Sequence, residues 1–408
     1  WLTPILGSLM LLRRLSVLFL LSAGSVLFGG AQPSGVVRLL SHYIPPSGGA
    51  YVAGCWGWTD TTTGREYALL GSSCGTSVVE ITNPAVPVER AFVPGVCSSW
   101  REIQVYQHYA YVVSEGGGGT QIIDLSFLPD SAHLIKNFIA YNFNGSFNTI
   151  RSHTLHIKNG TMYLNGCANW SVGGIVLFGL ADPENPAFLS AYERQYVHDC
   201  FVRNDTIFAA AIYGVGIDIV NASNKADPQH LYTISYAGAG THNTATTTDG
   251  KYVISTDEIG SAGYTLKIWD IQSPPSFPRV AEYVGSPTAI VHNVFVKGNL
   301  AIMSYYTKGL KIINIADPTT PVEIGGYDTY PADDHTGYTG AWSTYPFFPS
   351  GRIIIGDMET GLYVVDMDTA APNNVSPFSA YSDFQTPTSV VLNWTDPTTT
   401  IGGSPLGI

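Results

Sequence analysis

The stretch Gly-Leu-Lys-Ile-Ile-Asn-Ile-Ala-Asp-Pro-Thr-Thr-Pro (309–321) decides the fold of this chain, because variants of it return throughout the sequence. A close copy reads Thr-Ser-Val-Val-Glu-Ile-Thr-Asn-Pro-Ala-Val-Pro (76–87). In each copy a short apolar segment comes first, and a Gly-containing turn leads into a second one. Self-similarity at a period of about 40–50 residues is typical of propellers and solenoids.

Seven copies align on two positions. A Trp or His opens each copy, at Trp56, Trp100, His153, His198, His242, His292 and Trp342. A mostly polar position marks the end of the second apolar segment, at Glu80, Asp124, Gly179, Asn221, Asp270, Asn314 and Asp366. Opener and marker lie 22 to 28 residues apart, whereas successive markers lie 42 to 55 apart. Insertions therefore fall mostly in the links, as expected when each copy is one packed unit.

The repeated unit has the pattern of a four-stranded propeller blade. Its apolar segments are short, rich in Val, Ile, Tyr and Phe, and bounded by Gly, Asn, Asp and Pro. We therefore predict an all-β, seven-bladed β-propeller over residues 36–370. The seventh copy ends before an outer strand, and residues 36–44 resemble the missing one. We expect this N-terminal strand to complete the last blade, because exposed strand edges invite aggregation.

The two ends of the chain differ from the repeats. Residues 1–31 predict a secretory signal peptide, with a basic start after Met10, an apolar run over 15–28 and small residues at 29–31. Residues 1–9 resemble upstream read-through. After a linker at 371–378, residues 379–408 resemble the start of a fibronectin type III sandwich around Trp394. The apolar run is short for a membrane span, so we expect none in the mature chain.

Composition narrows the choice of partners. The chain has 408 residues and a net charge of −12. Without a basic cluster beyond the N-terminus, this charge argues against binding to nucleic acid. Five cysteines suit an exported protein, and their odd number leaves at least one unpaired. We expect either disulfides across neighbouring blades, Cys55 with Cys97 and Cys167 with Cys200, or buried thiols that pack as small apolar groups.

Three segments carry a family resemblance: residues 55–71, 98–103 and 340–351. Together with the Leu-x-Ile-x-Asp/Asn-Ile copies, they resemble the choice-of-anchor B family of bacterial exported proteins with LVIVD-type repeats, over residues 37–370. The resemblance implies a secreted or cell-surface β-propeller, with a C-terminal anchor that varies between members. It implies no substrate and no catalytic residues.

The openers are the strongest candidates for a site, because equivalent positions on inner strands converge near the axis of a propeller. We expect a ligand to contact Trp56, Trp100, Arg101, Asp199, Asn243, Asn293, Tyr305 and Trp342. The histidines on four consecutive blades, His153, His198, His242 and His292, could bind a divalent transition metal. Acidic residues near the ends of the following strands could join them, at Glu115, Asp257, Glu258, Asp357 and Glu359. In the competing structural interpretation, these histidines hydrogen-bond the backbone of a neighbouring blade.

Two functions follow from these interpretations. The first is an exported binding module for a surface protein, a glycan or a small molecule, with its site at the mouth of the channel. The alternative is a metal-dependent hydrolase or lyase that uses the histidine ring and a metal-bound water. Since propellers serve many unrelated functions, the fold alone does not separate the two, and we favour the binding module over an enzyme.

Overall fold

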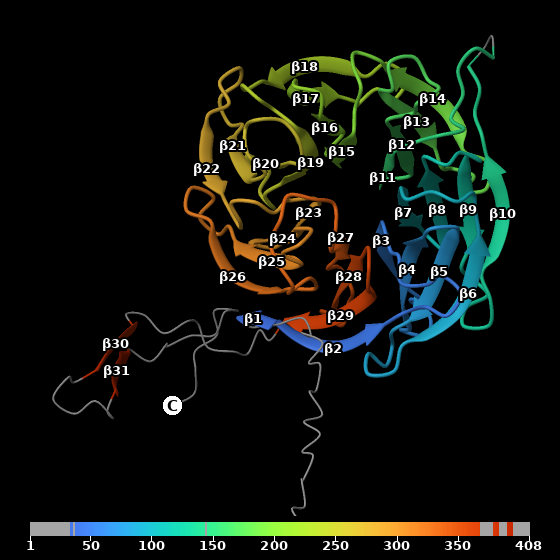
Figure 1. Ribbon diagram of the computed structural model, residues 1–408. Helices are drawn as coiled ribbons and strands as arrows, with labels where there is room; N and C mark the ends of the chain where they lie inside the picture. The colour runs from blue at the N-terminus through green and yellow to red at the C-terminus, as the bar shows by residue number, and fades with distance from the viewer. Residues whose placement is uncertain (1–32, 36, 143–144, 368–377, 383–389, 395–408) are drawn as a thin grey trace, which may run out of the picture.

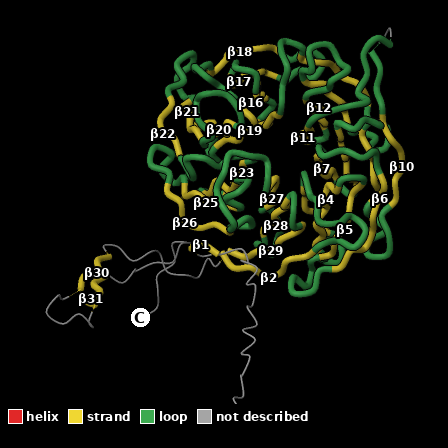
Figure 2. Tube along the Cα trace, in the orientation of Figure 1, coloured by secondary structure: helices red, strands yellow, loops and turns green. Residues whose placement is uncertain are grey.

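The computed structural model describes residues 33–35, 37–142, 145–367, 378–382 and 390–394. Figure 2 shows these residues as strands joined by loops. Seven antiparallel sheets surround one axis (Figure 1), so the predicted all-β, seven-bladed propeller is confirmed. In this part of the chain, no helix is long and apolar enough to cross a membrane.

Each blade contributes four strands in order from the axis outward. The innermost strands are β3 (Cys55–Thr59), β7 (Arg101–Tyr106), β11 (Thr154–Lys158), β15 (Asp199–Arg203), β19 (Thr241–Thr246), β23 (Val294–Lys297) and β27 (Ala341–Tyr345). The second strands are β4 (Glu66–Ser72), β8 (Tyr109–Ser114), β12 (Thr161–Asn165), β16 (Thr206–Ala211), β20 (Tyr252–Asp257), β24 (Leu300–Ser304) and β28 (Ile353–Asp357). The third strands are β5 (Gly75–Glu80), β9 (Thr120–Asp124), β13 (Ile175–Gly179), β17 (Gly216–Asn221), β21 (Leu266–Asp270), β25 (Leu310–Asn314) and β29 (Gly361–Met367). The outer strands are β6 (Val88–Pro94), β10 (His133–Phe138), β14 (Ala187–Tyr192), β18 (Gln229–Ile234), β22 (Arg279–Tyr283), β26 (Val322–Tyr327) and, in the seventh blade, β2 (Val37–Tyr43).

The N-terminal residues lie against the last two blades. β2 pairs antiparallel with β29, with Val37 opposite Met367 and Tyr43 opposite Leu362. The short strand β1 (Pro33–Gly35) adds a fifth strand to the sixth sheet by pairing with β26. These pairings cover strand edges that would otherwise present free backbone groups.

The remaining predictions about the chain ends fall largely outside the described residues. These are the signal peptide at 1–31, most of the linker at 371–378 and most of the segment 379–408. Within the last segment, β30 (Phe378–Ser382) pairs antiparallel with β31 (Val390–Trp394). The fibronectin type III-like continuation stays a prediction.

Apolar side chains pack between neighbouring blades. The cluster between the third and fourth blades joins Leu177 with Ile207 and Val220, all fully buried. The cluster between the seventh and first blades joins Ile354 and Val364 with Leu70 and Val79. The interface between the seventh and first blades, where the ring closes, is therefore packed like the other interfaces between blades. Each blade buries its two faces against its neighbours.

The cysteine pairing differs from the expectation. A disulfide joins Cys74 to Cys97, both in links next to strands of the first and second blades, so the expected Cys55–Cys97 bridge is wrong. Cys167 and Cys200 are free and buried, as is Cys55. Cys55 and Cys200 face the apolar clusters between blades, where a thiol packs as a small apolar group.

Removing the N-terminal strand should destabilise the ring. A chain that begins at residue 45 loses β1 and β2, exposes the edge of β29, and loses the buried Val37 side chain. Loss of one large buried aliphatic side chain costs about 2–5 kcal/mol, and the lost ladder adds to this. We expect a lower urea midpoint and self-association in light scattering, compared with a control chain that begins at residue 32. A monomer with an unchanged midpoint would contradict this role.

Candidate functional site

A cavity of about 460 Å³ lies on the axis, lined by residues of the innermost strands and the loops that follow them. Along each of these strands, alternate side chains face the axis and the others face the clusters between blades. The axial side chains therefore form layers. Two layers line the cavity, a polar floor and an aromatic wall, and a layer of histidines lies beyond the floor.

The polar floor takes one residue from each of six blades, and Gly54 holds the equivalent position in the first blade. The six are Glu102, Thr154, Asp199, Asn243, Asn293 and Ser343. Hydrogen bonds connect these residues from blade to blade. Asn243 Nδ2 donates to Asp199 Oδ2 over 2.6 Å, and the backbone N–H of Val294 donates to Asn243 Oδ1 over 3.1 Å. The Ser343 hydroxyl donates to the Ala53 carbonyl over 2.9 Å, across the seam of the ring. The floor thus joins neighbouring blades and also presents polar atoms to the cavity.

Two carboxyl groups of the floor have raised pKa values. Burial raises the pKa of Glu102 to about 7, although the Trp342 indole donates a hydrogen bond of 2.8 Å to it and opposes the rise. Burial likewise raises the pKa of Asp199 to about 6, against the hydrogen bonds from Asn243, the Cys200 N–H and Thr154. Both carboxyls can therefore exchange a proton near neutral pH, and can donate or accept hydrogen bonds.

The aromatic wall lies one layer further along the inner strands. Trp56, His156, Phe201 and Phe295 all line the cavity. The Trp56 ring lies 6.0 Å from Phe295 and the His156 ring 5.7 Å from Phe201. His156 Nε2 is buried without a hydrogen-bond partner among the described residues, and burial lowers the pKa of His156 to about 3. This imidazole is therefore neutral at pH 7.

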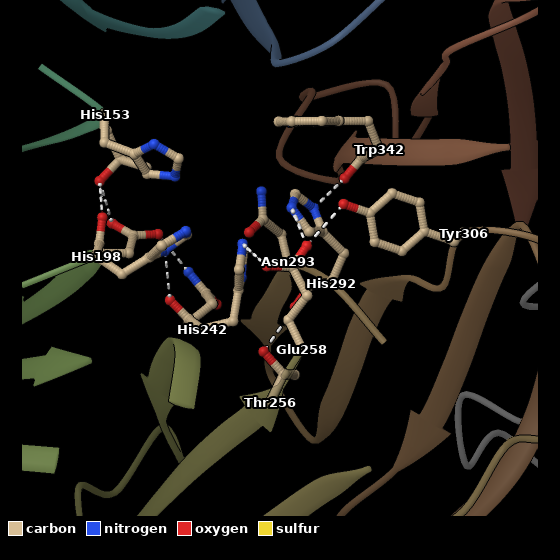
Figure 3. A network of polar contacts seen from close by, with 12 residues as sticks. His153, His198, His242, Thr256, Glu258, His292, Asn293, Tyr306 and Trp342 are labelled. Carbon is tan, nitrogen blue, oxygen red and sulfur yellow. Dashed lines mark hydrogen bonds and ion pairs between the residues drawn. The ribbon is translucent and has the colours of Figure 1, made fainter. Parts of the chain in front are cut away.

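The histidine layer lies at the beginning of the inner strands. Figure 3 shows the imidazoles of His153, His198, His242 and His292 following one another, with Tyr306 and Trp342 beside His292. Successive imidazole centroids are 4.0, 4.2 and 4.0 Å apart. Burial lowers the pKa of His198 and of His242 well below the ordinary range, and that of His292 to about 3.

Backbone hydrogen bonds orient two of these rings. His198 Nδ1 bonds the His242 carbonyl over 3.1 Å, and His292 Nδ1 bonds the Trp342 carbonyl. A carbonyl only accepts, so Nδ1 carries the proton in both rings and Nε2 keeps its lone pair. The structural interpretation of the histidines thus holds for these two residues. His153 differs, because its Nδ1 contacts Glu115 Oε1 at 2.5 Å.

Glu258 joins the histidine layer from the second strand of the fifth blade. It directly follows β20, which runs antiparallel to β19 and so returns the chain to the end where His242 lies. Its Oε1 accepts a 2.7 Å hydrogen bond from Tyr306 and lies 3.7 Å from His292 Nε2, while its Oε2 lies 3.7 Å from His242 Nε2. Burial raises the pKa of Glu258 to about 7.

Several predicted site residues do not lie in the expected ring. Trp56 lies in the aromatic wall, and Trp100 precedes β7, is 40% exposed and touches Trp342 edge-on. The alignment by aromatic residues placed both tryptophans at the position that the histidines occupy. In the structure, the strand register puts Ala53 and Arg101 at that position. The close approach of Gly54 shows this register, since a Cβ there would lie 2.5 Å from Glu102 Oε2.

Three other predicted ligand contacts lie away from the cavity. Arg101 is buried and donates to the carbonyls of Ser72 and Val96, and Tyr305 is buried with its hydroxyl bonded to the Tyr264 carbonyl. Trp342 belongs to the histidine layer. Asp199, Asn243 and Asn293 do line the cavity, as does Trp56.

Sequence reasoning left Glu102, Phe201 and Phe295 out of the predicted contacts. The sequence did contain a signal for Glu102. Ile103 and Cys200 are equivalent core-facing residues of their strands, so the residues before them, Glu102 and Asp199, are equivalent too. Aligning the copies on these core residues would have placed Glu102 in the floor.

This geometry defines a seven-bladed β-propeller with an axial cavity. The LVIVD repeat family model matches residues 290–329, which is consistent with a protein built from LVIVD-type repeats. No curated protein matches the chain. Among solved structures, a crystal structure of the computationally designed Ika8 protein is similar with a TM-score of 0.50 and 11% identity, over 79% of this chain and 98% of that one. This likeness concerns the fold alone. None of these comparisons supports a metal-dependent hydrolase or lyase.

The raised pKa of Glu102 predicts a pH-dependent stability. The folded protein holds this proton more tightly than the unfolded chain, whose Glu pKa is about 4.3. The stabilisation is complete below that value and is lost as the pH rises to about 7, by up to roughly 3 kcal/mol. We expect the urea midpoint of the wild type to fall between pH 5 and 8, and that of Glu102→Gln to fall less.

The matched control is Glu115→Gln, because the hydrogen bond with His153 lowers the pKa of Glu115 and reverses the sign of its contribution. Glu115→Gln should therefore not reduce the fall of the urea midpoint between pH 5 and 8. Equal slopes in the wild type and in Glu102→Gln would contradict the assignment.

Proposed function

We propose that this protein is a binding module whose axial cavity holds a small polar organic ligand or the end of a glycan. The observation that carries the proposal is the layered lining, with an aromatic wall above a hydrogen-bonding floor. The volume of about 460 Å³ falls within the range of ligand pockets. A pyranose ring or a similar flat molecule offers the matching chemistry, an apolar face for aromatic stacking and hydroxyl groups for the floor.

The floor provides the polar recognition. Asn293 Oδ1 is buried without a hydrogen-bond partner among the described residues, and the carboxyls of Glu102 and Asp199 lie in the same layer. Leaving a buried acceptor unpaired costs about 1–3 kcal/mol, so a ligand hydroxyl that reaches it gains more than a surface hydrogen bond would give. The ligand should therefore insert with its polar edge toward the floor and its flat face against Trp56.

Export belongs to the same proposal. The basic start, apolar run and small residues within 1–31 support secretion, and the resemblance to the choice-of-anchor B family supports a place on the cell surface. A fibronectin type III-like continuation beyond residue 379 would fit such a protein, and we propose that β2 holds the ring closed in the mature chain. A surface propeller with an axial pocket is suited to capture a ligand from the surroundings.

Trp56 should dominate ligand affinity. A screen of saccharides and small polar organic molecules by thermal shift, followed by calorimetry, should yield ligands that stabilise the wild type. Truncating a central aromatic contact costs about 2 kcal/mol or more, so Trp56→Ala should weaken binding by at least about 30-fold. Trp100→Ala is the matched control, since this indole lies outside the cavity and should leave affinity unchanged. A screen without ligands, or ligands equally sensitive to both substitutions, would contradict the proposal.

A further inference from the structure

Beyond the ligand cavity, we infer that His198, His242 and Glu258 form a binding site for one divalent transition metal ion. One donor atom from each of these three buried side chains lies within 4.8 Å of the other two. This set keeps His198 and His242 from the four histidines expected from the sequence, and His153 and His292 are not part of it. Glu258 completes it, as one of the acidic residues expected near the histidines. The inference does not depend on the proposed ligand, which can bind the cavity with or without a metal.

The tautomer of His198 fits a metal ligand. Its Nδ1–H donates to the His242 carbonyl, which leaves the lone pair of Nε2 free. A hydrogen bond from the second ring nitrogen to a backbone carbonyl is the usual way in which proteins orient a metal-binding imidazole.

His242 shows the clearest gap in hydrogen bonding. Its Nδ1 is buried without a partner among the described residues, and its Nε2 lies 3.7 Å from Glu258 Oε2, beyond hydrogen-bonding distance. Buried polar side-chain atoms are usually paired, so each exception calls for an explanation. A metal ion bound to His242 would occupy one of these two nitrogens.

Glu258 lacks a cationic partner of the ordinary kind. Among the described residues, the polar contacts of its carboxylate are the Tyr306 hydroxyl and the imidazoles of His242 and His292. The preceding residue, Asp257, is also buried but pairs with Lys267 Nζ at 2.9 Å. A divalent cation would give Glu258 the compensating charge that Lys267 gives Asp257, and burying an uncompensated carboxylate is costly.

The donor set limits the metal. Two imidazoles and one carboxylate suit Zn²⁺, and also Co²⁺, Fe²⁺ or Mn²⁺, rather than Ca²⁺ or Mg²⁺. Bond lengths of about 2.0–2.2 Å place tetrahedral ligand atoms a little over 3 Å apart, so the side chains would close by about 1 Å around the ion. Tyr306 would hold the carboxylate in position through its hydrogen bond, as a positioning residue.

Metal titration of the purified full-length protein, after treatment with a chelator, tests the site. We expect one equivalent of Zn²⁺, a rise in thermal midpoint on its addition, and a d–d absorption band with Co²⁺. His242→Ala and Glu258→Gln should each weaken Zn²⁺ binding by more than about 100-fold, and Tyr306→Phe by about 10-fold. Glu258→Gln keeps the size of the side chain and the oxygen that accepts from Tyr306, so it covers the case in which His242→Ala fails to fold.

His133→Gln is the matched control, because His133 lies exposed on the outer strand β10, away from both the metal site and the cavity. It should bind Zn²⁺ as the wild type does. Absence of a stoichiometric metal with Zn²⁺, Co²⁺, Fe²⁺ and Mn²⁺, or equal affinity in Glu258→Gln and wild type, would overturn the inference. The ligand screen with Trp56→Ala is a separate experiment. Failure of the metal proposal therefore leaves the cavity proposal intact, and failure of the cavity proposal leaves the metal proposal intact.

Discussion

The hydrogen bonds that pass between neighbouring inner strands are the constraint on which the rest of this structure depends. Seven strands begin beside one axis, and their first side chains are removed from water before any ligand arrives. Their polar atoms must therefore find partners in the next blade, because an unpaired buried group costs free energy. Thr154 bonds the His198 carbonyl, His198 the His242 carbonyl, and Ser343 the Ala53 carbonyl, which carries the pattern across the seam.

This constraint separates structural and binding roles along the axis. Where a side chain is satisfied by the two neighbouring blades, as Asn243 is by Asp199 before it and Val294 after it, the layer holds the ring together. Where a polar atom has no partner among the described residues, as at Asn293 Oδ1 and His242 Nδ1, the atom is available to bind a ligand. The first of these atoms lies in the floor of the cavity. The second belongs to His242, in the histidine layer beyond, where the other ring nitrogen, Nε2, lies 3.7 Å from Glu258 Oε2.

The sequence predicted the architecture well because the repeat records it seven times. Spacing and β-branched composition were enough for the all-β class and the seven blades. Of the residues expected to contact a ligand, Asp199, Asn243, Asn293 and Trp56 line the cavity, whereas Arg101, Tyr305, Trp100 and Trp342 do not. The misplacements arose where the copies were aligned by residue type and not by strand register. Trp56, for example, lies in the aromatic wall, two layers along the channel from the histidines with which it was aligned. The Cys74–Cys97 disulfide joins two links, where the repeat gives no register.

An experimental structure of the protein soaked with a set of small organic probe molecules would test the central claim most directly. The claim is that the axial cavity is built to hold a small organic ligand. We predict that the probes gather between Trp56 and Phe295, with their polar atoms toward Asp199 and Asn293. Probes that gather elsewhere, with only water in the cavity, would contradict this account.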